Sequence, residues 1–94
     1  MTIPPPLVII NVSGGAGSGK LNTLGNVIGV GAKGPNGAVF DVEMFDGDGF
    51  PIWGQSGLSD LSKISVDLSL FHDTQIFITN ATQDGEYKLK FWYV

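Results

Sequence analysis

The sequence predicts an all-β protein: a single small antiparallel β-sandwich of the jelly-roll or immunoglobulin-like kind, with a small β-barrel as the alternative. Apolar and polar residues alternate with a period of two in most segments, as strands with one buried face require. Short stretches rich in Gly, Pro, Asn and Asp separate these segments and favour turns. No segment carries the i, i+3, i+4 apolar spacing of a helix, and 94 residues leave room for one core, so we expect one domain over residues 1–94.

The N-terminal part of the chain is expected to contain a lead-in, one strand and a long glycine-rich region. Residues 1–6 include three consecutive prolines, which favour a stiff extended lead-in. The apolar run LVIINV at residues 7–12 predicts the first strand. Many of the 14 glycines follow, so we expect residues 13–37 to form loops.

Four segments with strong alternation predict strands in the rest of the chain, at residues 38–45, 63–70, 74–80 and 86–94. Tight turns are expected where DGDGFP and QDG interrupt the pattern. The apolar positions of the four segments should form the core, and they are Phe40, Val42, Met44, Ile64, Val66, Leu68, Ile76, Ile78, Tyr87, Leu89 and Phe91.

Charge and cysteine content limit the classes of partner. The net charge is −4, no arginine or cysteine is present, and five lysines are spread along the sequence, at Lys20, Lys33, Lys63, Lys88 and Lys90. Nucleic acids and anionic membranes are bound by clustered cations, so we expect neither partner. The N-terminal residues show no signal peptide or membrane span, so the compartment stays undetermined. The sequence is expected to be either a cytoplasmic protein or a domain excised from an extracellular or virion protein.

A glycine loop at residues 14–20 matches the phosphate-binding pattern G-x-x-x-x-G-K. Leu21 stands where that motif needs a hydroxyl for magnesium. The residues that follow contain too many glycines for the helix whose N-terminus would face the phosphate. The sequence therefore predicts no nucleotide site.

Two further patterns are weak candidates for a metal site and a catalytic site. Asp46 and Asp48 place two carboxylates on one turn, which resembles part of a calcium loop, but the further ligands and the closing Glu are missing. An Asp-Gly hairpin turn is the simpler explanation. Calcium is the one cofactor that the sequence suggests. Ser56, His72 and Asp73 supply the residue types of a small hydrolase, but neighbouring His and Asp side chains on a strand point to opposite faces. We therefore expect no enzyme.

The aromatic residues Phe50, Trp53 and Trp92 are the candidate ligand-binding residues. Phe50 and Trp53 fall at turns, and Trp92 falls on the polar side of its strand. An outward aromatic ring can stack on a sugar, join a subunit interface or cover the edge of a core, and all three interpretations remain open.

Two motifs in the second half of the chain resemble a known family. A strand ends in an Asp-x-Asp-Gly turn at Asp46 and Asp48, and the last strand carries Gly-x-Tyr-x-Leu at Gly85, Tyr87 and Leu89. In order and spacing, residues 38–92 are similar to the bacterial pre-peptidase C-terminal type of β-sandwich. The resemblance implies an accessory domain of a secreted enzyme that binds a surface or polymer without catalysis. The glycine-rich N-terminal third departs from the family pattern.

These observations favour a non-catalytic binding or accessory module that binds a carbohydrate or a protein surface, with the three aromatic residues as contacts. The alternative is a structural subunit that forms homo-oligomers in a virion or another assembly. A small hydrolase is the third hypothesis.

Overall fold

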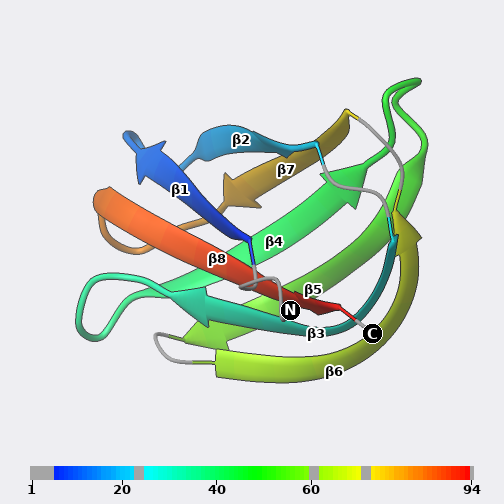
Figure 1. Ribbon diagram of the computed structural model, residues 1–94. Helices are drawn as coiled ribbons and strands as arrows, with labels where there is room; N and C mark the ends of the chain where they lie inside the picture. Colours follow the sequence, from blue (N-terminus) through cyan, green and yellow to red (C-terminus); the bar gives the residue numbers. More distant parts are fainter. Residues whose placement is uncertain (1–5, 23–24, 60–61, 71–72, 94) are drawn as a thin grey trace.

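The protein forms two four-stranded antiparallel sheets packed face to face, in the computed structural model shown in Figure 1. The structure describes residues 6–22, 25–59, 62–70 and 73–93. The strands are β1 (Leu7–Val12), β2 (Gly17–Leu21), β3 (Gly25–Lys33), β4 (Val39–Phe45), β5 (Pro51–Ser59), β6 (Ser62–Leu70), β7 (Thr74–Thr79) and β8 (Gly85–Tyr93). No helix in the described part of the chain is long and apolar enough to cross a membrane. The predicted β-sandwich is confirmed, and the two sheets do not close into the alternative barrel.

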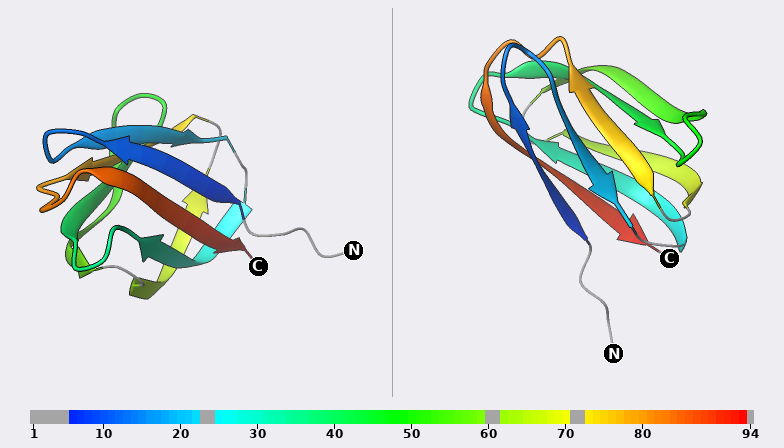
Figure 2. Two further views of the ribbon diagram at one scale, coloured as in Figure 1. Left: turned by 90° about the vertical axis from the view of Figure 1, so that its left-hand side faces the viewer. Right: turned by 90° about the horizontal axis from the view of Figure 1, so that it is seen from above.

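The strand order is that of a jelly roll. One sheet has the order β1-β8-β3-β6 and the other has the order β2-β7-β4-β5. Each strand of the first half of the chain pairs antiparallel with one of the second half, in the pairs β1·β8, β2·β7, β3·β6 and β4·β5. This nested pairing, divided between two sheets, is the jelly-roll arrangement. Figure 2 shows the two layers from the side, with β1 and β2 against each other where the sheets meet.

The core fills the space between the sheets and follows the predicted alternation. Eight of the predicted inward residues are buried, namely Phe40, Val42, Met44, Ile76, Ile78, Tyr87, Leu89 and Phe91. Ile64, Val66 and Leu68 have the predicted orientation but are only partly buried, because β6 is an edge strand. The rings of Phe40 and Tyr87 pack edge to face within this core, with 4.8 Å between the ring centroids.

The expectation that residues 13–37 form loops is wrong, because this range holds β2 and the whole of β3. Several of its glycines mark places where another chain segment comes too close for a side chain. A Cβ atom on Gly17 would lie 2.6 Å from the carbonyl oxygen of Asn11, and one on Gly19 would lie 3.0 Å from Ile10 and Val8. These glycines therefore allow β2 to pack against β1. Of the proline-rich lead-in, residues 1–5 lie outside the described residues, and the Pro6 carbonyl accepts a hydrogen bond from Phe91 N–H.

Candidate functional site

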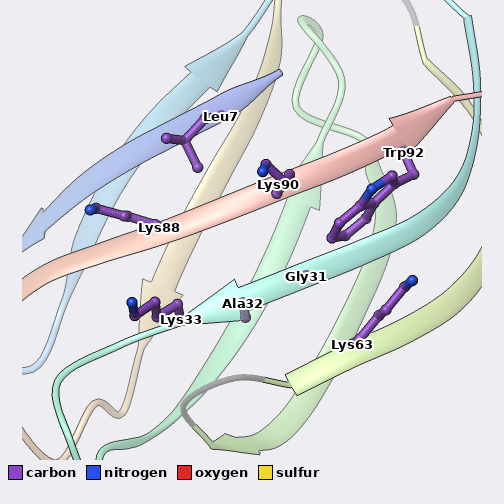
Figure 3. Close-up of a pocket in the computed structure, with 8 residues that line it drawn as sticks. All are labelled: Leu7, Gly31, Ala32, Lys33, Lys63, Lys88, Lys90 and Trp92. Carbon is purple, nitrogen blue, oxygen red and sulfur yellow. The ribbon is translucent and has the colours of Figure 1, made fainter. Parts of the chain in front are cut away.

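An open groove of about 410 Å³ lies on the outer face of the β1-β8-β3-β6 sheet. Residues from all four strands of this sheet line it, as Figure 3 shows. The lining residues are Leu7, Gly31, Ala32, Lys33, Lys63, Lys88, Lys90 and Trp92. We refer to this surface as the lysine groove, because it holds four of the five lysines of the chain.

The strand register arranges the lysines in two neighbouring rows across the sheet. In one row, Lys88 on β8 lies directly opposite Lys33 on β3. In the other row, Gly31 lies between Lys90 on β8 and Lys63 on β6. Neighbouring strands are about 4.8 Å apart, and alternate residues on a strand are roughly 7 Å apart. The four side chains therefore start from a patch of sheet roughly 10 Å wide and 7 Å long.

The indole of Trp92 occupies one end of the lysine groove and points from β8 toward β3 (Figure 3). A Cβ atom on Gly31 would lie 2.7 Å from the indole atoms Cη2 and Cζ3, so the ring occupies the space that a side chain would fill. Nζ of Lys63 lies over the ring, 4.8 Å from its centroid, in a cation–π contact. Trp92 therefore joins an apolar surface to the cationic one.

The positive charge of the lysine groove has little compensation from carboxylates. Among the described residues, the only ion pair joins Nζ of Lys88 to Oε1 of Glu86 at 3.6 Å, and both side chains are exposed. Asp67 shares the outer face of β6, but it is four residues, or roughly 13 Å, along the strand from Lys63. The groove thus concentrates positive charge in a chain whose net charge is −4.

The expectation that the lysines are spread out and form no cluster is therefore wrong for four of the five. The alternation pattern correctly places Lys63, Lys88 and Lys90 on outward faces, but only the strand order brings β8, β3 and β6 side by side. Lys33 was missed because its segment was expected to be a loop. Lys20 is the exception, since it lies on the outer face of the other sheet, opposite Gln75.

The three aromatic residues expected to contact a ligand do not form one site. Trp92 lines the lysine groove, whereas Phe50 and Trp53 belong to the β4-β5 hairpin of the other sheet. Phe50 is 66% exposed beside the turn. Trp53 lies opposite the buried Met44 and packs against the core, and it also lines a second pocket, of about 330 Å³, along β4 and β5. Trp53 thus covers a core edge, one of the interpretations left open by the sequence.

Asp46 is used to close the turn between β4 and β5. Its Oδ1 atom accepts hydrogen bonds from the N–H groups of Asp48 and Phe50, each at 2.9 Å. Among the described residues, no group of three Asp, Glu or His side chains that could hold a metal ion includes Asp46 or Asp48. The hydrogen bonds give Asp46 a structural role in the hairpin turn, and calcium binding stays a prediction.

The glycine loop is a β-hairpin turn and not a phosphate cradle. Gly14 and Gly15 have φ angles of 66° and 82°, as a two-residue type I′ turn requires, and β2 follows in place of a helix. Their N–H groups donate to the two carboxylate oxygens of Asp84, both at 3.1 Å. The amides that could face an anion are thus already occupied by a side chain of the same protein.

Of the three residues that a hydrolase would use, the two that the structure describes are not brought together. Ser56 lies in β5 beside the middle of β4, between the partners of Phe40 and Val42, whereas Asp73 precedes β7 near the end of β4 at Phe45. His72 lies outside the described residues.

Comparisons of the chain with protein-family models, curated proteins and solved structures gave no significant match. The function has to be inferred from the geometry of the surface.

Proposed function

We propose that this protein is a non-catalytic binding module that holds a carbohydrate chain in the lysine groove. The position of Trp92 carries the proposal, because its indole lies in an open groove among hydrogen-bond donors. An aromatic ring offers an apolar surface to the C–H face of a sugar at low entropic cost. Lysine ammonium groups supply donors for the sugar oxygens around it. The groove therefore combines the two kinds of contact that a sugar chain needs.

The fold and the family resemblance agree with this proposal. Jelly-roll domains include both lectins and virus capsid proteins, so the architecture is compatible with carbohydrate binding but is not specific for it. The resemblance of residues 38–92 to pre-peptidase C-terminal domains also implies binding without catalysis, and it remains a prediction.

Affinity gel electrophoresis tests the proposal, with a panel of soluble neutral and charged polysaccharides included in the gel. We expect retardation by at least one polysaccharide, and we expect Trp92→Ala to weaken it by about tenfold or more without lowering the melting temperature by more than a few degrees. Trp53→Phe is the matched control and should bind normally, because Trp53 packs against the core. If no polysaccharide retards the wild-type protein, or if Trp92→Ala binds as the wild type does, the proposal is wrong.

An assembly subunit is the second candidate function. The observation in its favour is that Leu7 and Ile9 on β1 and Ile28 on β3, in the sheet that carries the lysine groove, are each about half exposed. Because β1 is an edge strand, it could pair with a strand of a neighbouring subunit. The solution mass distinguishes the two functions: a stable oligomer that dissociates in Ile9→Gln favours assembly, and a monomer favours binding.

A further inference from the structure

We infer that the carbohydrate held in the lysine groove is a polyanion, namely a polysaccharide whose sugars carry carboxylates. This inference rests on the proposed function and specifies the chemistry of its ligand. Among the described residues, the lining of the groove includes four ammonium groups and no acidic side chain. Each ammonium group carries a full positive charge and up to three donors, so the groove is complementary to carboxylates repeated along a chain.

The direct opposition of Lys33 and Lys88 is the first specific argument. Like charges on directly opposed residues of an antiparallel pair destabilise the sheet. Among the described residues, Glu86 forms an ion pair with Lys88 and with no other lysine, and both side chains are exposed, so this pair relieves the repulsion only in part. A ligand carboxylate between Lys33 and Lys88 would replace this repulsion with two attractive contacts. Repulsion between Lys33 and Lys88 thus lowers the stability of the free protein, and a bound anion would remove this repulsion.

The contact between Lys63 and Trp92 is the second argument, because it links charge recognition to sugar stacking. Nζ of Lys63 lies over the indole in the free protein and covers part of the ring. A carboxylate that draws the ammonium group of Lys63 away would pair with it and uncover the indole for the sugar ring. A neutral sugar lacks the group that moves Lys63. The arrangement therefore favours a charged sugar over a neutral one at the same position.

The composition of the face favours an acidic polysaccharide over a nucleic acid. Single-stranded nucleic acids are held by several aromatic rings on which successive bases stack, whereas the described residues that line the groove include one aromatic residue, Trp92. Outside the lining residues, the chain carries one lysine and nine acidic residues. These acids repel a polymer as densely charged as a nucleic acid wherever it extends beyond the groove.

Polygalacturonate and highly methyl-esterified pectin form a matched pair of probes, because they share a backbone and differ in the carboxylate charge. Binding is measured by titration calorimetry at about 0.01 M and about 0.1 M NaCl, between which the Debye length falls from ~30 Å to ~10 Å. We expect polygalacturonate to bind at least about tenfold more tightly than esterified pectin and to weaken with added salt. The double variant Lys33→Gln/Lys88→Gln should lose at least about tenfold in affinity for polygalacturonate.

Lys20→Gln is the control for loss of a lysine outside the groove, since Lys20 lies on the other sheet and the variant removes one positive charge there. It should bind polygalacturonate as the wild type does. Fluorescence adds a second readout: in a Trp53→Phe background Trp92 is the only tryptophan, and polygalacturonate should change its emission with the same midpoint as the calorimetric titration.

The contrary outcomes separate the inference from the proposed function. Equal binding of both probes with no effect of the lysine double variant, but with loss of binding in Trp92→Ala, would overturn the inference and leave the proposed function standing. Binding of no polysaccharide would overturn both. Binding of an oligothymidylate as tightly as polygalacturonate, with the same dependence on Lys33 and Lys88, would overturn the inference in favour of a nucleic-acid surface.

Discussion

The indole of Trp92 lies over Gly31, where a Cβ atom would come within 2.7 Å of two ring carbons. Gly31 does not have a positive φ angle, so the glycine is required by the ring and not by the backbone. The position of the Trp92 ring on β8 therefore depends on a glycine of the neighbouring strand β3.

Gly31→Ala should displace the indole of Trp92 and weaken polysaccharide binding by about tenfold. Gly29→Ala is the matched control, because its Cβ atom would lie 3.6 Å from Trp92, an ordinary contact distance. Tryptophan emission and affinity in the two variants check the prediction. Equal binding by both variants would show that the observed ring position is not needed.

Asp84→Ala should destabilise the fold by about 1 kcal/mol, because the N–H groups of Gly14 and Gly15 lose their acceptor. Urea unfolding measures the change in unfolding free energy. Glu86→Gln is the control, because it removes a carboxylate whose ion pair is with an exposed lysine. The freed loop should still bind no ATP, because β2 follows it where a phosphate loop needs a helix. ATP binding by Asp84→Ala would contradict this account of the glycine loop.

Stability should fall in acid partly through Asp41. Hydrogen bonds from the side chain of Asn80 and from the N–H of Gly57 lower the pKa of Asp41 below its ordinary value of 3.8. A carboxyl group with a lowered pKa in the folded state stabilises the protein above its unfolded-state pKa, and this contribution is lost as the pH falls through the folded-state value. Asp41→Asn should therefore unfold at a lower temperature than the wild type at pH 7. The two melting temperatures should converge as the pH falls below 3.8. A constant difference across that range would mean that ionised Asp41 does not stabilise the fold.

Core truncations should separate the central strands from the edge strand. Ile78→Ala should cost about 2–5 kcal/mol of unfolding free energy, because Ile78 is fully buried on β7. Ile64→Ala should cost clearly less, because Ile64 is only partly buried on β6. Equal losses in denaturant unfolding would contradict the edge position of β6.

The sequence predicts the fold class and most of the core because alternation is a local property of each strand. It fails for β2 and β3, whose glycines at Gly17, Gly19 and Gly31 reflect close contacts with other strands and not turns. It also fails for β5, which lies at a sheet edge and pairs irregularly with β4.

The lysine groove could not be predicted for a related reason. Lys33 and Lys88 are far apart in the chain and become neighbours only through the pairing of β3 with β8. Such a site depends on strand order, which composition and alternation do not determine. Trp92 was identified as a candidate because its outward position is a property of one strand.

A titration of the ¹⁵N-labelled protein with oligogalacturonate shows whether the lysine groove is the ligand-binding surface. We predict amide shift changes concentrated in residues 29–33, 63–65 and 88–92, which surround the groove on three neighbouring strands. Shift changes concentrated instead around Phe50 and Trp53 in the β4-β5 hairpin, or no changes at saturating ligand, would contradict it.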